Sequence, residues 1–262
     1  MFESSTLIHT STEPTEVTDE PVLQVVDSGA VRILMMNRPE KLNALNSELT
    51  QALVDALTEA DASERVRAVV LGGRGRGFCA GADLSEFAEL TPAQQEKVSK
   101  RADLTARLQT LPQQMSKPII SVVQGPAVGG GAGLAIGCDM MVAADTLKFG
   151  YPEIKHSIVP ALVMTGMQRQ IGRKLAFELI STGRLLSAQE VHDIGLANEI
   201  CPAKDALQRG IDIATTWAEA TPAAMRSIKE LFYRVADLPF EAAMRAGRDV
   251  NTIMRGFRED RP

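Results

Sequence analysis

Short apolar runs and longer amphipathic stretches alternate along the first half of this chain. Two of the runs, residues 22–26 and 31–36, flank Asp27-Ser28-Gly29, which has the composition of a tight turn. Together they predict a β-hairpin. Asn46-Ser47 can cap the next helix, whose apolar positions share one face: Leu49, Leu53, Ala56, Leu57 and Ala60. An apolar strand at residues 68–71 completes a strand, helix, strand alternation.

The same alternation occurs a second time. Thr91-Pro92 followed by Gln94 is a strong helix-start signal and predicts a helix that runs to about Leu111. Residues 119–123 and 140–144 have the uninterrupted apolar character of buried strands. Gly129-Gly130-Gly131 opens a short apolar helix between them. These two cycles predict an α/β fold.

After Gly150 the pattern becomes helical almost to the end of the chain. Ser187 with Glu190 predicts a capping box, and Thr221-Pro222 starts a helix with four apolar positions: Ile228, Leu231, Phe232 and Val235. We therefore expect a flexible tail at residues 1–20, an α/β core at 21–200 and a helical segment at 201–262. The tail is rich in Ser, Thr and Glu without any sustained period.

Composition narrows the class of protein. The chain has 262 residues, 45% of them hydrophobic, and a net charge of −5, so it can form a sizeable core and has no basic footprint for nucleic acid. No run approaches the roughly 20 apolar residues of a membrane span, so we expect a cytoplasmic protein without a membrane partner. Three cysteines lie far apart, which predicts buried thiols rather than disulfides or a metal cluster: Cys79, Cys138 and Cys201.

Two glycine-rich turns are the strongest candidates for chemistry. Residues 77–84 and 125–133 each follow a predicted strand and precede a predicted helix. Backbone N–H groups at such a position can point at a ligand, and glycine lets the ligand approach closely. For either turn alone, the plainer interpretation is that glycine serves a tight turn. As a pair they could form an oxyanion hole, whereas the glycine spacing does not match a dinucleotide-binding fingerprint.

Four segments in this order resemble the enoyl-CoA hydratase/isomerase (crotonase) family. They are residues 37–45 (Asn-Arg-Pro-Glu-Lys-Leu-Asn-Ala-Leu), 78–84, 125–131 with the later Cys138-Asp139, and 149–153. With residues 182–185 and 195–198, the resemblance extends from about Val22 to Pro202. It implies a spiral of ββα units, a helical C-terminal oligomerisation segment, and a homotrimer or a dimer of trimers.

The resemblance also implies an acyl-CoA thioester as substrate and no separate cofactor or metal. By the same resemblance, the N–H groups of Ala82 and Gly130 form the oxyanion hole and Glu153 is the acid/base. The positions that it places beside the substrate are Lys41, Leu42, Ala44, Ala80, Asp83, Leu84, Gly129, Gly133 and Ala161.

At two places the sequence departs from the hydratase pattern of this family. Hydratases have a first glutamate at the position of Gly133, and only the second one is kept here, as Glu153. A lone glutamate resembles the Δ3,Δ2-enoyl-CoA isomerases, in which one base moves a proton from the α- to the γ-carbon. The family often has glycines after the proline that follows, whereas Pro160 here precedes Ala161-Leu162-Val163-Met164. This predicts a narrower, more apolar pocket, in which the N–H of Ala161 could hold a water.

Several alternatives stay open. We favour double-bond isomerisation over hydration of a 2-enoyl-CoA, for example a branched or glutaconyl-type one. Hydrolysis or decarboxylation of an acyl-CoA and silent acyl-CoA binding are the other candidates. His156, Glu86 and Glu89 are secondary acid/base candidates whose plainer interpretation is a structural or solvated side chain. Arg255 and Arg258 could contact the CoA phosphates.

Overall fold

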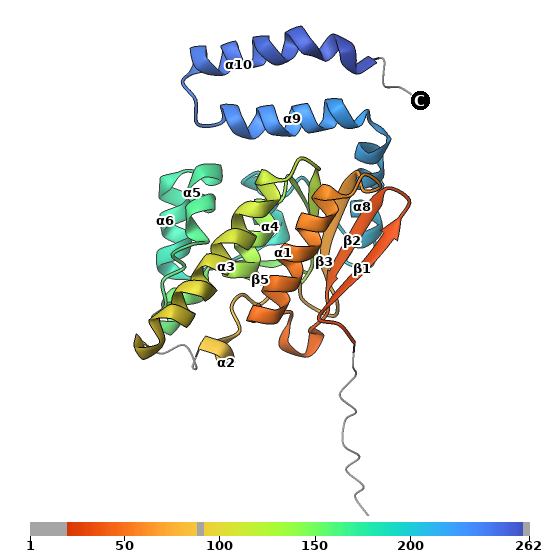
Figure 1. Ribbon diagram of the computed structural model, residues 1–262. Coiled ribbons are helices and arrows are strands. Elements are labelled where there is room, and N and C mark those ends of the chain that lie inside the picture. Colours follow the sequence, from red (N-terminus) through yellow and green to blue (C-terminus); the bar gives the residue numbers. More distant parts are fainter. Residues whose placement is uncertain (1–19, 88–91, 259–262) are drawn as a thin grey trace, which may run out of the picture.

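The computed structural model describes residues 20–87 and 92–258 (Figure 1). The predicted tail lies outside these ranges except for its last residue. The predicted hairpin is present: β1 (Leu23–Ser28) pairs antiparallel with β2 (Val31–Met36). The main sheet has the order β1-β2-β3-β4-β6-β9, and every pair after the hairpin is parallel. Its other strands are β3 (Ala68–Gly73), β4 (Ile119–Val123), β6 (Met140–Ala144) and β9 (Glu199–Cys201).

A second sheet of three short strands lies beside the first. Its order is β5-β7-β8, with β5 (Pro126–Val128) parallel to β7 (Lys148–Gly150) and β7 antiparallel to β8 (Leu185–Ser187). Each strand has three residues. Such short segments show no period, so the sequence pattern did not predict them, and it also missed β9. The region after Gly150 is therefore not continuously helical.

Helices cover both faces of the main sheet (Figure 1). One face packs against α1 (Ser47–Ala62), α3 (Gln95–Gln114) and α4 (Gly130–Gly137). The other face packs against α8 (Ala206–Glu219), whose Ala214 and Ala218 allow close contact with the strands. Side chains of a strand alternate between the two faces, so the uninterrupted apolar strands fill both cores.

The helix signals of the sequence are largely confirmed. The side chain of Asn46 accepts a hydrogen bond from the N–H of Leu49 and caps α1. Ser187 and Glu190 form the capping box at the start of α7 (Ala188–Asp193). The helix predicted from Thr91-Pro92 begins with a 3-10 turn, η2 (Pro92–Gln94), before α3, and Pro112 lies inside α3. The other elements are α2 (Leu84–Phe87), α5 (Met164–Ile171), α6 (Arg173–Thr182), η1 (Pro39–Lys41), η3 (Pro152–His156) and η4 (Met254–Arg258).

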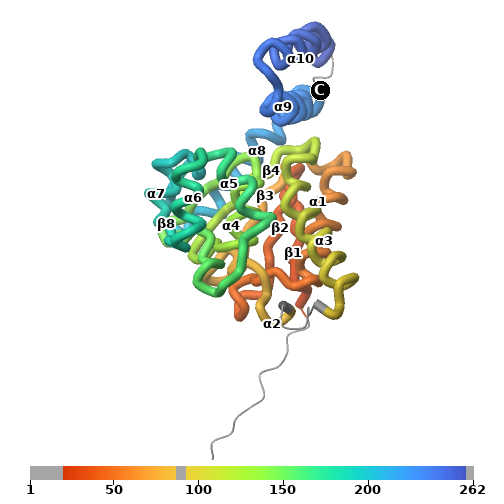
Figure 2. The backbone as a smooth tube through the Cα atoms, turned by 90° about the vertical axis from the view of Figure 1, so that its left-hand side faces the viewer, coloured from red at the N-terminus to blue at the C-terminus, as the bar shows by residue number. Residues whose placement is uncertain are grey.

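The last two long helices form a hairpin at one end of the body, by which we mean the two sheets with helices α1 to α8. α9 (Pro222–Val235) lies against this end and α10 (Phe240–Ile253) lies beyond it (Figures 1 and 2). The buried Lys229 fixes α9, because its ammonium donates to the carbonyls of Pro112 and Lys117 and to the carboxylate of Asp139. The predicted helical segment thus has two parts, since α8 belongs to the core of the body.

None of the helices described is both long and apolar enough to span a bilayer.

Candidate active site

The small second sheet brings Glu153 to the second glycine turn. Val128 at the end of β5 pairs with Gly150 at the end of β7, and the N–H of Gly129 donates to the carbonyl of Gly150 at 2.9 Å. The residues after the carboxyl ends of two adjacent parallel strands must lie at the same edge. Gly129 and Gly130 follow β5, and Glu153 follows β7 through the turn η3. Two segments more than 20 residues apart thereby form one site.

Gly129 has a backbone conformation that only glycine adopts easily, with φ +54° and ψ −120°. A β-carbon at this position would lie 2.5 Å from Oε1 of Glu153. The carboxylate therefore lies directly against the turn from which α4 begins.

Main-chain hydrogen bonds join the first glycine turn to the second. The N–H of Val128 donates to the carbonyl of Cys79, and the N–H of Cys79 donates to the carbonyl of Pro126, each at 3.0 Å. Gly81 has φ +86°, and a β-carbon there would lie 2.9 Å from the carbonyl oxygen of Val128. Gly81 thus permits a close approach of the two turns that a larger residue would prevent.

Two backbone N–H groups have no described acceptor where the two glycine turns meet, at a place that we call the junction. Among the described residues, no acceptor receives a hydrogen bond from the N–H of Ala82 or from that of Gly130. The nitrogen of Ala82 lies 3.9 Å from the position of a β-carbon on Gly130. Gly130 is the first residue of α4, so the helix dipole adds partial positive charge at this end. Paired donors of this kind can stabilise an oxyanion.

The carboxylate of Glu153 lies against Gly129, the residue that precedes Gly130 at this junction. Its Oε2 is buried and has no hydrogen-bond partner among the described residues. Burial raises the pKa of Glu153, because the charged form loses solvation, although the backbone N–H of Glu153 and, less strongly, nearby His156 oppose the effect. The buried hydroxyl of Tyr151 also lacks a partner in the described part of the chain. A carboxylate in such an environment is suited to take up and return a proton.

The predicted substrate segment after β2 is held by Asn43, a residue that sequence reasoning did not single out. The fully buried side chain of Asn43 donates to the carbonyls of Arg74 and Gly77 and accepts from the N–H of Arg38. Nothing in the spacing of the sequence indicates a buried amide here. Asn43 thus fixes the loop whose Leu42 carbonyl accepts a hydrogen bond from the N–H of Ala80.

The other predicted substrate positions near this loop differ in exposure. Lys41 and Leu84 are exposed, whereas Ala44 is buried. Asp83 is buried, and its carboxylate accepts from Arg38 at 2.9 Å and from the hydroxyl of Ser85 at 2.6 Å. These donors lower the pKa of Asp83, Ser85 more than Arg38. The side chain of Asp83 therefore holds the loop together, and its contact with a substrate stays a prediction.

The surroundings of Gly133 contain a second residue that sequence reasoning missed. A β-carbon on Gly133 would lie 2.6 Å from Oε1 of Gln109 and 2.8 Å from Cβ of Val163. Gln109 comes from α3, and its amide donates to the carbonyl of Gly130 at 2.9 Å. Only the packing of α3 on α4 brings Gln109 here, so no sequence signal could have indicated it. The N–H of Ala161 donates to the carbonyl of Val159 at 2.8 Å, so the bond we expected it to make with a water is already taken.

The secondary candidates fall outside the junction or have structural partners. Glu86 accepts hydrogen bonds from the N–H of Ser47 and from the side chain of Arg101. Burial alone would raise the pKa of Glu86, but these donors outweigh it and the pKa is lowered. His156 is exposed, and so is Arg255 on η4. Glu89 and the side chain of Arg258 lie outside the described residues.

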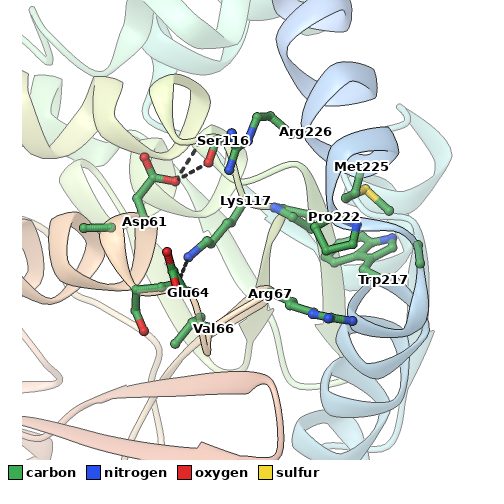
Figure 3. A pocket seen from close by; sticks show the side chains of 14 residues that line it. Asp61, Glu64, Val66, Arg67, Ser116, Lys117, Trp217, Pro222, Met225 and Arg226 are labelled. Atoms are coloured by element: carbon green, nitrogen blue, oxygen red, sulfur yellow. Dashed lines mark hydrogen bonds between the residues drawn. The ribbon is translucent and has the colours of Figure 1, made fainter. Parts of the chain in front are cut away.

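A hollow of about 270 Å³ lies elsewhere, between the end of the body and α9 (Figure 3). Lys117 extends across it to the carbonyls of Ala60 and Ser63, and Asp61 accepts from Ser116. Trp217 and Arg226 face it from the other side. Its polar groups largely join α1, β4 and the C-terminal helices, and it does not include Glu153 or either glycine turn.

Cys79 and Cys138 are buried, as the sequence predicted, whereas Cys201 is only half-buried; all three thiols are free. Burial raises the pKa of Cys79 to about 12, so this thiol is not a nucleophile. Across the described ranges, no cluster of three or more His, Cys, Asp or Glu side chains is arranged to hold a metal ion.

Comparison with known proteins decides the family. The enoyl-CoA hydratase/isomerase profile matches residues 27–254. This chain belongs to the enoyl-CoA hydratase/isomerase family. A Thermus thermophilus protein named as an enoyl-CoA hydratase is 36% identical over 247 residues, which cover 90% of this chain and 98% of that protein. The 2,3-dehydroadipyl-CoA hydratase of Escherichia coli is 33% identical, with 88% of this chain and 89% of that protein covered.

Solved structures of the enoyl-CoA hydratase/isomerase family have the same fold. The enoyl-CoA hydratase of Mycobacterium smegmatis superposes with a TM-score of 0.84 at 31% identity, covering 90% of this chain and 91% of that one. The enoyl-CoA hydratase of Bacillus anthracis gives a TM-score of 0.84 at 30% identity, covering 88% and 90%. The predicted α/β fold with C-terminal helices is thus confirmed. The protein is an enzyme of this family that acts on acyl-CoA.

Proposed function

We propose that the enzyme moves the double bond of an unsaturated acyl-CoA, with Glu153 as its acid/base and the N–H groups of Ala82 and Gly130 as its oxyanion hole. The observation that carries this proposal is the buried Oε2 of Glu153, which has no partner among the described residues and lies near the place where two glycine turns meet, each with one free N–H donor. Gln109 and Val163 occupy the space next to Gly133, and neither can exchange a proton. One acid/base group is sufficient for a 1,3-proton shift.

The reaction proceeds in two proton transfers. The carboxylate of Glu153 takes the α-proton of a 3-enoyl-CoA, and the electrons of the C–H bond form a dienolate whose oxygen accepts from Ala82 and Gly130. Two preorganised donors in a partly dry site typically lower such a barrier by a few kcal/mol each. The carboxylic acid of Glu153 then returns the proton to the γ-carbon, and the product is the conjugated 2-enoyl-CoA. This chemistry requires no group beyond the chain and its thioester.

Hydration of a 2-enoyl-CoA is the second candidate. The names of the relatives favour it, since both compared proteins and both compared structures are named as hydratases. The same oxyanion hole serves both reactions, because each passes through an enolate. Glu153 alone could support hydration only if one water supplied both the hydroxyl and the proton.

Product analysis in heavy-oxygen water separates the candidates. The purified enzyme is incubated with trans-2-, cis-3- and trans-3-enoyl-CoA, and the products are identified by mass and by double-bond position. We expect a shifted double bond at unchanged mass. Incorporation of heavy oxygen at the β-carbon as the main outcome would make hydration the better account, and a released free acid would indicate thioester hydrolysis. No conversion together with tight acyl-CoA binding would leave only the binding role.

We further propose that the enzyme assembles as a trimer, alone or as two stacked trimers. The hairpin of α9 and α10 carries large apolar side chains on its surface, among them Phe232 at 67% and Phe240 at 78% exposure. A patch of this kind favours contact with another copy of the chain. Leu207, Ile211 and Trp217 do not belong to this surface, because they pack against the main sheet from α8.

A further inference from the structure

Gln109 joins the long helix α3 to the first residue of α4. Its Nε2 donates to the carbonyl of Gly130 at 2.9 Å. The N–H of Gly130 is one of the two unused donors at the junction. The side chain of Gln109 is half-buried. The amide is therefore anchored at one end, within one residue of the proposed oxyanion hole.

The other end of this amide is an open acceptor. Oε1 of Gln109 receives no hydrogen bond from any described residue, and it is the heavy atom nearest to the position of a β-carbon on Gly133, at 2.6 Å. Its neighbour at this place is the apolar side chain of Val163. Gly133 lies one helical turn beyond Gly129, against which Glu153 is packed. A glutamine oxygen and a glutamate carboxylate thus lie against the same short stretch of α4, while the other side chains nearest to it are apolar or a thiol: Leu45, Cys79 and Val163.

We propose that Oε1 of Gln109 binds the water that adds to the β-carbon of a 2-enoyl-CoA, and that this contact sets the ratio of hydration to double-bond migration. The inference rests on the proposed function, since it requires an enoyl-CoA in this site with Glu153 as the base. Gln109 holds water by hydrogen bonding alone, because a carboxamide neither gains nor loses a proton at ordinary pH.

Hydration requires only one base, because a single water supplies every atom that is added. The oxygen of the bound water forms a bond to the β-carbon while Glu153 takes one of its protons, and the π electrons move to the thioester oxygen as an enolate. The enolate accepts from Ala82 and Gly130. Glu153 then delivers the same proton to the α-carbon, so that one water supplies both the hydroxyl and the hydrogen. Without an acceptor such as Gln109, this water has no fixed position on an apolar wall.

Three variants test the proposal. Gln109→Leu keeps the approximate size but removes the acceptor, and Gln109→Glu keeps the acceptor and adds a charge. The matched control is Gln170→Leu, because Gln170 makes the same kind of hydrogen bond, at 2.9 Å, to the carbonyl of Ile136 near the other end of α4. All variants are compared at equal folded fraction, which is established by thermal melting.

The expected result is a change in partition rather than a uniform loss. Gln109→Leu should lower hydration of trans-2-enoyl-CoA by about three- to tenfold, the range of a net hydrogen bond, while migration changes less than about twofold. Gln109→Glu should shift the pH midpoint of migration upward, because a second carboxylate further raises the pKa of Glu153. A purely structural glutamine would move neither the ratio nor the pH profile. An unchanged ratio in folded Gln109→Leu overturns the proposal, and so does an equal change in Gln170→Leu. Migration without any hydration, by both the wild type and Gln109→Glu, also overturns it.

A binding measurement keeps this test separate from the proposed function. After addition, the oxygen of the water is the 3-hydroxyl of the product, so Gln109 should also accept from 3-hydroxybutyryl-CoA. Calorimetry should show that Gln109→Leu weakens this ligand about three- to tenfold and leaves butyryl-CoA unchanged. If no enoyl-CoA is converted but this difference is found, the proposed function fails and the Gln109 contact stands. If both ligands respond equally, the contact is refuted whatever the reaction.

Discussion

Lys229 and Asp139 form a 2.7 Å ion pair although 90 residues separate them in the sequence. The lysine side chain is 4% exposed, and its ammonium also donates to two carbonyls. Asp139 in turn accepts from the N–H of Ile119 and from the hydroxyl of Tyr233. This cluster attaches the C-terminal hairpin to the start of β4, the central strand that leads to the second glycine turn.

Lys229→Met should therefore destabilise the protein strongly. It leaves the carboxylate of Asp139 without its cation, and breaking one side of a buried pair typically costs about 3–5 kcal/mol of unfolding free energy. Denaturant unfolding measures the loss. Lys100→Met is the control, because the Lys100–Glu96 pair is exposed at 74% and 83% and should contribute less than about 1 kcal/mol. Similar losses in the two variants would contradict a structural role for Lys229.

Glu153→Gln should lower turnover by at least about a hundredfold with little loss of CoA binding, because it removes the proposed base and keeps its shape. Steady-state kinetics and calorimetry measure the two effects. Wild-type activity should rise with pH through the raised pKa of Glu153, since the base must be ionised. Near wild-type turnover of the variant would remove Glu153 from the mechanism.

The same substitution should stabilise the fold at neutral pH. Since burial raises the pKa of Glu153, the folded protein binds this proton more tightly than the unfolded chain does. The stability of the wild type therefore falls as the pH rises from the ordinary pKa of glutamate through the raised value. Melting curves should show Glu153→Gln above the wild type at pH 7 and close to it near pH 4. The exposed Glu230→Gln should show no such difference, and a lower melting temperature of Glu153→Gln at pH 7 would refute the argument.

Gly133→Glu tests the preference for isomerisation, but the packing of Val163 against Gly133 makes a second substitution necessary. Its β-carbon would lie 2.8 Å from Cβ of Val163, so the single variant should lose about 1–3 kcal/mol by overpacking. Gly133→Glu with Val163→Gly, which removes this Cβ, should recover part of this loss and raise hydration of trans-2-enoyl-CoA relative to migration. If the wild type already hydrates at about 1 to 1,000 per second and the folded double variant keeps the same product ratio, the isomerase preference is wrong.

Phe232→Asp and Phe240→Asp should weaken self-association, because each places a charge in the exposed apolar surface of the C-terminal hairpin. Light scattering should give three or six times the mass of the chain for the wild type and smaller particles for the variants. A monomeric wild type at micromolar concentration would contradict the proposed assembly.

The main sheet apart from β9, and its principal helices, follow from the sequence because their signals are local. A hairpin turn at Asp27-Ser28-Gly29, a cap at Asn46 and uninterrupted apolar strands each act over a few residues. The placement of Ala82, Gly130 and Glu153 came from the resemblance to a family. The structure adds the physical reason for it, the pairing of β5 with β7.

The remaining features depend on contacts between distant segments. Gln109, Asn43 and Lys229 are polar residues without any period or spacing that marks them, and each acquires its partners only when helices and loops pack. The apolar residues of α8 are a different case, because what is missing from the sequence is the surface that they contact. The sequence alone does not say whether the apolar face of this helix covers its own sheet or a neighbouring subunit.

The two free donors at the junction belong to the main chain, held in place by hydrogen bonds between segments 79–83 and 126–130. No substitution of a side chain can delete them, short of proline. Evolution of such a site is consequently restricted in one respect and free in another. Under the proposed mechanism, affinity for an enolate is inherited with the backbone, while side chains beside the site, such as Gln109, Val163 or the residue at position 133, can be exchanged to redirect the same intermediate toward a different product.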